Sequence, residues 1–377
     1  MLFNSRYSTR NVKVYQSKYF EEEIKSGTTY TVGESDEFPM PGTETNPKIS
    51  RWTTISGNEL DGKPYMGRKA QRIMVVRALA STIVSNQDIR AEDIEFNLLA
   101  CPGYVECYDE MVTLATDRRE TCYIVADCPA RLAPDATAIS EWAKNSNNAA
   151  SNGDDGLTTR YTYSCMCYPW GLGTNLDGYE VAIPSSAMKL RQLAVSDSMT
   201  NAVWKPAAGV RRGIVSNAAS VGYINSENEY QPVKLQSGLR DVLFDNGINP
   251  IYNIPGYGLT IWGDKTLSSV NSALDAEGVA RMVVMMRSDL DKMVKPFFFE
   301  LNTKSTRDSV KNMVEVYLQV IMAREGLDDF VVVCDDSNNT FARVSNHELW
   351  IDVAILPTYS IRWIYIPIRI VNDSSKL

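Results

Sequence analysis

The chain has 377 residues, of which 44% are hydrophobic and 22% are charged, so it can bury sizeable cores and is not disordered, fibrous or collagen-like. It carries 46 acidic and 38 basic side chains, and the net charge of −8 argues against nucleic acid as a main partner. A single histidine, His347, leaves the chain short of the side chain on which most hydrolytic and metal chemistry depends.

Residues 1–96 are rich in Ser, Thr, Gly, Pro and charge, with short β-prone pieces such as residues 73–76. This composition predicts a loop-rich, mainly β region with a modest core. No apolar run reaches about 18 residues, and none follows Met1, so we expect neither a membrane span nor a signal peptide. The seven cysteines are irregularly spaced and include no Cys-x-x-Cys pair, which predicts buried free thiols in a reducing compartment.

From residue 96 onward, strands and helices alternate. Apolar runs at residues 98–101 and 122–126 flank a helical stretch through Met111 and Leu114. This order predicts a parallel β-α-β unit. Further elements are expected in the same pattern: helices near residues 139–143 and at 185–199, and strands at 161–168 and 179–183.

Beyond Trp204 the helices and strands are segregated rather than alternating. Helical spacing of apolar residues predicts helices at residues 281–294 and 309–322. Strands are expected at residues 330–334, 349–356 and 361–370. The last strand carries isoleucine at every second position, and Pro367, which lacks an amide hydrogen, favours a place at a sheet edge.

The stretch from Gly258 to Thr266 nearly matches a phosphate-binding loop. However, Asp264 stands between Gly263 and Lys265, which puts a carboxylate where an anion would bind and shifts the lysine. We therefore favour a strand and a turn over a nucleotide site.

The other candidate sites are also explained by structure alone. His347 lies in a polar turn without a serine-nucleophile motif, which favours a solvated histidine over a catalytic base. Cys165 and Cys167 share one face of a strand but have no further metal ligands, and Asp335 and Asp336 fit a turn better than a calcium loop. No catalytic residue, cofactor or metal is expected, although a carboxylate-pair enzyme and a lysine nucleophile stay open.

Three blocks share their order and spacing with one known family. They are "LLACPG" with "YIVADCP" at residues 98–103 and 123–129, "VAIPSSAMKLRQLAVSDSMTNAVWKPAAGVRRG" at 181–213, and "LRDVLFDNGINPIYNIPGYGLTIWGDKTL" at 239–267. In these blocks the chain resembles the tail sheath proteins of contractile bacteriophages. That family includes the sheaths of type VI secretion and of other contractile injection systems.

The resemblance implies a fold that is α/β plus α+β. Its parts would be a variable outer insertion domain at residues 1–96, a subtilisin-like α/β core without a catalytic triad at 97–214, and a C-terminal α+β sheath domain at 215–377. The family's N-terminal arm has no counterpart before Ser5, so we expect a trimmed fragment.

The resemblance also implies a structural role without enzyme activity. Sheath subunits polymerise as stacked hexameric rings around a tail tube and contract to drive the tube through the host envelope. The implied partners are other copies of the chain and the tube, baseplate and tail terminator proteins, in a virion tail assembled in the host cytoplasm. Nucleic acid is not an expected partner, and no direct insertion into a membrane is expected. The competing hypotheses are a cryptic hydrolase, a nucleotide-binding protein that uses the loop at residues 258–266, and another tail component.

Two surfaces are expected to make contacts. Because family arms add strands to neighbouring C-terminal sheets, the expected subunit interface is the edge strand, with Ile361, Trp363, Tyr365, Pro367 and Arg369. The helix at residues 309–322 is preceded by a basic stripe, spaced i, i+3, i+7, that is a candidate for facing an acidic tube: Lys304, Arg307 and Lys311. A solvated helix face is the alternative for this stripe.

Overall fold

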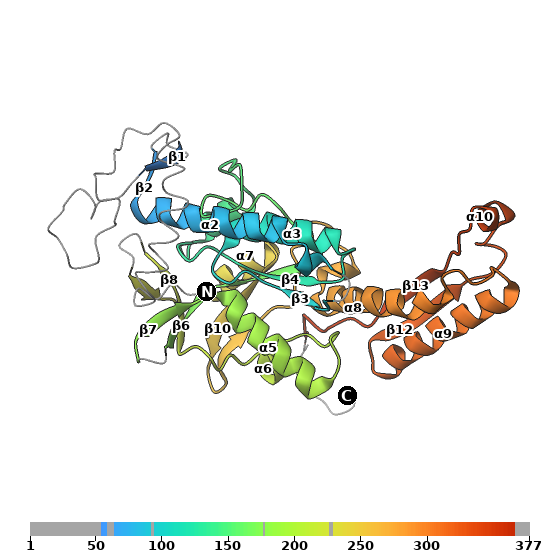
Figure 1. The fold of residues 1–377 in the computed structure, drawn as a ribbon. Coiled ribbons are helices and arrows are strands. Elements are labelled where there is room, and N and C mark those ends of the chain that lie inside the picture. The colour runs from blue at the N-terminus through green and yellow to red at the C-terminus, as the bar shows by residue number, and fades with distance from the viewer. Residues whose placement is uncertain (1–53, 59–63, 92–93, 176–177, 226–228, 366–377) are drawn as a thin grey trace, which may run out of the picture.

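The computed structural model describes residues 54–58, 64–91, 94–175, 178–225 and 229–365 (Figure 1). Its centre is a five-stranded sheet in the order β11-β10-β5-β4-β3. The strands are β3 (Leu98–Leu99), β4 (Tyr123–Asp127), β5 (Ser164–Tyr168), β10 (Ile248–Ile254) and β11 (Gly258–Ile261). Only the edge strand β11 runs antiparallel to its neighbour. Every residue of β4 and β5 is buried, as expected for central strands of a parallel sheet with both faces covered.

Helices cover both faces of this sheet and complete an α/β core (Figure 1). On one face, a cluster that includes Met111, Trp142 and Leu243 joins the sheet to three helices: α3 (Tyr108–Asp117), α4 (Ala136–Ala143) and α7 (Ser237–Asp245). On the other face, Leu193 and Val284 pack against the sheet from two helices: α5 (Ser185–Thr200) and α8 (Glu277–Val294).

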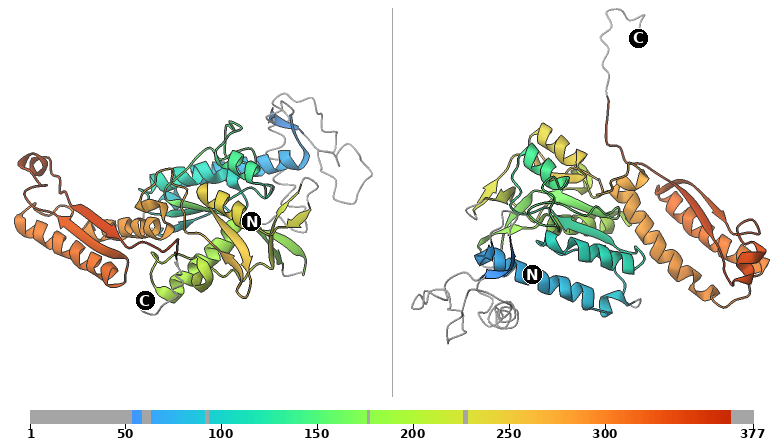
Figure 2. Two further views of the ribbon diagram at one scale, coloured as in Figure 1. Left: turned by 180° about the vertical axis from the view of Figure 1, so that it is seen from behind. Right: turned by 90° about the horizontal axis from the view of Figure 1, so that it is seen from above.

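Two further units flank the core. A four-stranded antiparallel sheet in the order β7-β6-β8-β9 consists of β6 (Trp170–Thr174), β7 (Glu180–Ile183), β8 (Ser220–Ile224) and β9 (Tyr230–Pro232). The C-terminal lobe consists of α9 (Lys304–Ala323), β12 (Leu327–Val333), α10 (Phe341–Ser345) and β13 (Asp352–Pro357). Helix α8 leads from the core to this lobe, which projects to one side of the molecule (Figures 1 and 2).

The remaining elements are short, apart from one long helix. They are β1 (Thr54–Asn58), β2 (Pro64–Met66), α2 (Gly67–Ser85), α6 (Gly209–Arg212), and the 3-10 turns η1 (Asp88–Arg90), η2 (Val105–Cys107), η3 (Ala273–Asp275) and η4 (Lys295–Phe297). Among the described residues, no helix is both long and apolar enough to cross a membrane.

The predicted β-α-β unit is confirmed, because β3 and β4 pair in parallel and α3 lies between them in the chain. The predicted helices at residues 281–294 and 309–322 are confirmed as parts of α8 and α9. The division between residues 214 and 215 falls inside the core, because β10 and β11 extend the same sheet as β5.

The expectation of β-prone pieces before residue 96 is wrong for residues 73–76, which lie in α2. Met74 and Ala78, four residues apart, are buried, so a helical stripe packs near α3 and outweighs the β propensity of the Ile and Val residues. Arg72 on this helix donates hydrogen bonds to Glu106 and to the Gly103 carbonyl, which attach α2 to the core.

Asp127, at the end of β4, connects three segments of the core. Its carboxylate accepts hydrogen bonds from the Gly103 amide at 2.7 Å, the Ser185 hydroxyl at 2.9 Å, and the amide and hydroxyl of Ser186, both at 2.6 Å. Burial raises the pKa of Asp127, while these donors favour its charged form. The start of α5 and the turn after β3 are therefore held at one point.

A second polar cluster anchors α8 in the core. The Lys189 ammonium of α5 lies 2.7 Å from the Glu277 carboxylate of α8, and both side chains are fully buried. Burial alone would lower the pKa of Lys189, but the Glu277 charge outweighs it and raises that pKa. One turn further along α8, Arg281 pairs with Asp197 of α5. The first turns of α8 thus make two ion pairs with a single core helix.

Replacing Lys189 by Met leaves Glu277 as an unpaired buried charge, so we expect the free energy of unfolding to fall by about 3–5 kcal/mol. Chemical denaturation followed by circular dichroism measures this. The matched control is Lys205→Met. Lys205 lies 3.2 Å from Glu325, whose side chain is exposed, so losing this ion pair should lower the free energy of unfolding by less than about 1 kcal/mol. Equal losses in the two variants would show that the buried pair does not hold α8 in place.

Candidate functional site

The C-terminal lobe contains a sheet of only two strands. Strands β12 and β13 pair antiparallel with Val331 opposite Ala354, and within the described residues neither strand has another partner. Helix α9 covers one face, where Val314, Leu318 and Ile321 pack near Val332. An isolated pair of strands is marginal in water, and both outer edges leave backbone groups available for further strands.

The opposite face of this small sheet is partly apolar and open. Val331 on β12 is 57% exposed and Leu356 on β13 is 50% exposed. Exposed β-branched and leucine side chains on a two-stranded sheet are typical of a surface that another chain covers. The lobe therefore presents an apolar sheet face that the described part of the chain leaves open.

The segment after β13 returns to the core and is fastened there by one arginine. The Arg362 guanidinium lies between two carboxylates, with its Nε atom 2.8 Å from Asp264 Oδ1 and its Nη1 atom 3.0 Å from Asp275 Oδ1. The Ser360 hydroxyl also donates to Asp264. We call this group of Ser360, Arg362, Asp264 and Asp275 the arginine clamp. Since it joins residues almost a hundred positions apart, it fixes where the segment leaves the core.

The side chains around the arginine clamp point mostly to solvent. Ile361 is 81% and Tyr365 is 85% exposed, whereas Trp363 contacts the Phe244 ring edge-to-face at 6.1 Å between centroids. The described end of the segment leads away from the body of the molecule (Figure 2). An exposed apolar segment held at its root is well placed to contact another chain.

The expected strand at residues 361–370 is not formed where the structure describes it. Ile361, Trp363 and Tyr365 lie in a segment without helix or strand, and among the described residues this segment pairs with no strand. Pro367 and Arg369 lie outside the described residues. The expected interface residues therefore begin on an unpaired segment and not on a sheet edge.

The structure divides the basic stripe on α9. Lys304 is exposed at the start of the helix, and Lys311 is half-buried, 3.9 Å from Glu315. Arg307 lies on the buried face, where it pairs with Asp336 at 2.6 Å. Arg307 therefore fastens the start of α9 to the turn after β12, and only the two lysines keep an open side.

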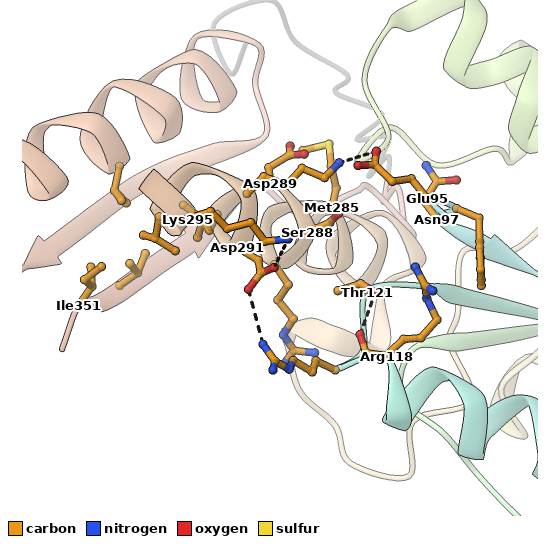
Figure 3. Close-up of a pocket in the computed structure, with 18 of the residues that line it drawn as sticks. Glu95, Asn97, Arg118, Thr121, Met285, Ser288, Asp289, Asp291, Lys295 and Ile351 are labelled. Atoms are coloured by element: carbon orange, nitrogen blue, oxygen red, sulfur yellow. Dashed lines mark hydrogen bonds and ion pairs between the residues drawn. The ribbon is translucent and has the colours of Figure 1, made fainter. Parts of the chain in front are cut away.

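A cleft of about 870 Å³ separates the lobe from the core (Figure 3). Ion pairs connect its walls: Lys292 lies 2.7 Å from Glu95, and Arg119 lies 3.7 Å from Asp291. A hydrogen bond from Lys292 lowers the pKa of Glu95. The lining contains neither histidine nor cysteine. These contacts join the second half of α8 to the core.

The remaining candidates occupy structural positions. The stretch from Gly258 to Thr266 forms β11 and a turn, as predicted, and its Asp264 binds Arg362. His347 follows α10 and is exposed. No group of three or more His, Cys, Asp or Glu side chains in the described part of the chain is placed to hold a metal ion.

Cys165 and Cys167 are buried in β5, in the packing position that was predicted for them. Asp335 accepts hydrogen bonds from the Ser337 amide and hydroxyl, which confirms the predicted turn around Asp335 and Asp336.

The arginine clamp was missed by the sequence reasoning. Two residues in the sequence could have indicated it. Arg362 is a charged residue in an otherwise apolar run, and Asp264 is the carboxylate that departs from the phosphate-loop pattern. The sequence does not show that the two lie together, because their contact spans two units of the fold.

Comparisons with known proteins agree with this architecture. Residues 269–371 match the family model of the phage tail sheath C-terminal domain, and this range contains all of α8, the C-terminal lobe and Arg362. The chain is related to the contractile tail sheath proteins.

Among the curated sheath relatives, the tail sheath protein of Vibrio phage KVP40 is 32% identical over 161 residues, which are 43% of this chain and 22% of the relative. The tail sheath protein of Enterobacteria phage T4 is 26% identical over 255 residues, 66% of this chain and 37% of the relative. The chain thus spans well under half the length of these relatives.

Two solved sheath assemblies share the fold. The contracted PVC sheath complex, from an extracellular contractile injection system, aligns with a TM-score of 0.60 and 18% identity, covering 80% of this chain and 75% of its own. The contracted helical sheath of the anti-feeding prophage aligns with a TM-score of 0.58 and 19% identity, covering 83% and 79%. The mixed α/β architecture is therefore that of sheath subunits.

Replacing Arg362 by Ala should release the segment after β13, because charge-assisted hydrogen bonds of this kind contribute about 1.5–3 kcal/mol each. We expect chymotrypsin to cleave near Trp363 at least about tenfold faster than in the unchanged chain. Arg211→Ala, an arginine exposed on α6, is the control and should leave the rate as it was. Unchanged cleavage in the Arg362 variant would mean that the clamp does not hold the segment.

Proposed function

We propose that this chain is a structural subunit of a contractile tail sheath. Many copies would stack as hexameric rings around a tail tube, and a change in subunit packing would drive the tube through the host envelope. The observation that carries the proposal is the C-terminal lobe: a two-stranded sheet with open edges, next to an exposed apolar segment held by the arginine clamp. The sheath relatives and the shared sheath fold support it.

The role proposed for the chain is mechanical and not enzymatic. The nucleotide-binding alternative depended on the stretch from Gly258 to Thr266. This stretch forms β11 and the turn after it, and its Asp264 pairs with Arg362. The charged side chains of the described cleft are engaged in ion pairs such as Lys292 with Glu95, which join α8 to the core. A subunit that acts by changing its packing against its neighbours needs a body that stays folded and surfaces that can exchange contacts. The core would serve as the body, and the lobe would provide the surfaces.

We further propose a division of the chain into parts. The sheet-centred core corresponds to a subtilisin-like α/β domain used without a catalytic triad, and it extends through β11 instead of stopping at residue 214. The C-terminal sheath unit then begins near α8, in line with the matched family range of 269–371. Residues 1–96 are proposed as a variable outer domain.

Subunits would connect through strand addition. The proposed donor is the segment that carries Ile361, Trp363, Tyr365, Pro367 and Arg369, and the proposed acceptor is the open sheet edge of β12 or β13 on another copy. Main-chain hydrogen bonds would supply affinity, while alternate side chains would enter the exposed apolar face. Such a link would survive rearrangement of the subunit bodies, because the paired strand is joined to its own body by the single segment after β13.

The tube-facing surface is proposed to lie at the start of α9. Lys304 and Lys311 would face acidic groups of the tube protein, and Arg307 would hold the helix end in position through Asp336. Baseplate and tail terminator proteins are the other proposed partners, and the proposed location is the virion tail, assembled in the host cytoplasm.

Removing residues 358–377 should abolish self-association, because the donor segment is lost while the lobe keeps its own contacts. Negative-stain microscopy and sedimentation velocity compare the full and the shortened chain. We expect rings or tubes only from the full chain, with the circular dichroism spectrum of both chains indicating a folded core. A full chain that stays monomeric at every concentration, or a shortened chain that still polymerises, would contradict the proposal.

Reversing the charge of the two open lysines, Lys304→Glu together with Lys311→Glu, should weaken binding to the tube. Co-sedimentation with polymerised tube protein at about 0.15 M salt should show at least about a tenfold loss, since charge pairs across interfaces contribute about 1.5 kcal/mol or more. Self-association of the chain should be unchanged. Lys144→Glu, at the end of α4, is the control. Unchanged co-sedimentation of the double variant would exclude this face of α9.

A further inference from the structure

Helix α7, strands β10 and β11 and the segment after β13 bring aromatic rings and cations together on the core. The Arg240 guanidinium lies over the Tyr252 ring, 4.1 Å from its centroid, and Tyr252 contacts Trp262 edge-to-face at 6.1 Å. One turn along α7 from Arg240, the Phe244 ring lies 4.5 Å from the Lys265 ammonium and 6.1 Å from the Trp363 ring. We call this surface the aromatic patch, and its residues are Arg240, Phe244, Tyr252, Trp262, Lys265 and Trp363.

The aromatic patch is open to solvent and carries two cations that can bind an anion. Trp262 is 46% and Trp363 is 65% exposed, and Arg240 and Lys265 are half-buried. Each cation is held over a ring, and within the described residues neither has a carboxylate partner. Trp, Tyr and Arg are the side chains that most often dominate binding at protein interfaces. The patch therefore fits a surface that combines carboxylates with apolar side chains.

The small sheet of the C-terminal lobe has such a surface on the side away from α9. Side chains alternate along β12, so that Phe330 and Val332 pack toward α9 while Asp329 and Val331 point to solvent. On β13, the partners of Asp329, Val331 and Val333 are Leu356, Ala354 and Asp352, all of which are exposed. We call this surface the outer sheet face, and its residues are Asp329, Val331, Asp352, Ala354 and Leu356.

The outer sheet face has a carboxylate near each end and apolar side chains between them. Asp329 accepts a hydrogen bond from the Phe330 amide at 2.8 Å, and Asp352 accepts one from the Asn338 side chain at 2.9 Å. Among the residues that the structure describes, neither carboxylate forms an ion pair. Its two negative charges and its apolar centre are thus complementary to the cations and rings of the aromatic patch.

We propose that the aromatic patch of one copy binds the outer sheet face of another copy, an inference that rests on the proposed self-association of the chain. Arg240 and Lys265 pair with the two carboxylates of the face, while the tryptophan rings cover its apolar centre. The patch lies on the core and the face lies on the projecting lobe (Figures 1 and 2). The contact is therefore head-to-tail, and repeating it produces a ring or a helical array. A strand added at the sheet edge leaves this face open.

Exchanging charges between two full-length variants tests the contact. Arg240→Glu with Lys265→Glu makes the patch acidic, and Asp329→Lys with Asp352→Lys makes the face basic. Each variant alone opposes like charges at every contact, so sedimentation velocity should show self-association at least about tenfold weaker than in the unchanged chain. An equal mixture of the two variants opposes unlike charges again, and we expect it to recover the association.

The control for the change in net charge is Arg211→Glu with Lys144→Glu, two exposed cations elsewhere on the core, and it should associate as the unchanged chain does. If both patch and face variants associate as well as the unchanged chain, or if their mixture does not recover, the inference is overturned and the proposed function stands. An unchanged chain that stays monomeric would contradict the proposed function, and this inference with it.

Cross-linking of the unchanged chain decides the question even if a charge variant fails to fold. A carbodiimide joins a lysine amine to a carboxylate only where the two are in contact. Polymers that contain equal amounts of isotope-labelled and unlabelled chain are treated and mapped by mass spectrometry. We expect Lys265 joined to Asp329 or Asp352 in peptide pairs that combine a labelled and an unlabelled peptide. A polymer without this pair, or with the pair only inside single copies, would overturn the inference.

Discussion

The structure depends on how the first turns of α8 are held in the core. Lys189 and Glu277 are removed from water completely, and Arg281 and Asp197 pair one turn further on. Desolvating such charges costs about as much as their attraction returns, so the pairs add less to stability than to the choice of one geometry. A purely apolar contact would let α8 slide or rotate, whereas a buried ion pair allows one register. The direction in which the C-terminal lobe projects follows from this register.

The cleft and the arginine clamp complete this arrangement from two sides. Ion pairs between Glu95, Arg119 and the second half of α8 connect the lobe to the core across the cleft, at exposed positions where each pair is weak. On the other side, Arg362 fixes the returning segment between Asp264 and Asp275. The buried ion pairs hold the first turns of α8 in the core, and the weaker, exposed ion pairs lie along its second half, nearer the lobe. This distribution suits a body that stays folded while contacts at its periphery are exchanged.

Local sequence patterns predicted the elements whose burial is decided within the element. The stripe of Val314, Leu318 and Ile321 in α9 and the apolar run of β4 are examples, since one face or a whole strand enters a core. The segment after β13 has an equally clear alternation, yet its described residues, 358–365, form no strand, because a strand needs a partner edge and alternation cannot supply one. Helix α2 was misjudged because the packing of Met74 and Ala78 outweighs local β propensity.

The site residues that escaped prediction depend on contacts between distant positions. Asp127 receives Ser185 and Ser186 from 58 and 59 positions away, and Arg362 reaches Asp264 across 98 positions. No spacing rule connects such residues, although a carboxylate at the end of a buried strand indicates that donors must be nearby. Arg307 shows a related limit of spacing rules: its spacing with two lysines places it on a basic stripe, and a contact with the distant Asp336 holds it on the buried face of α9.

The central claim is that the small sheet of the C-terminal lobe is completed by another copy of the chain. Cryo-electron microscopy of the assembled polymer tests it most directly, because strand pairing between subunits is visible in the main-chain density. We predict a strand from a neighbouring copy, beginning near Ile361, alongside the β12–β13 pair. A sheet that stays two-stranded in the polymer, or one that is completed by the subunit's own segment, would contradict it.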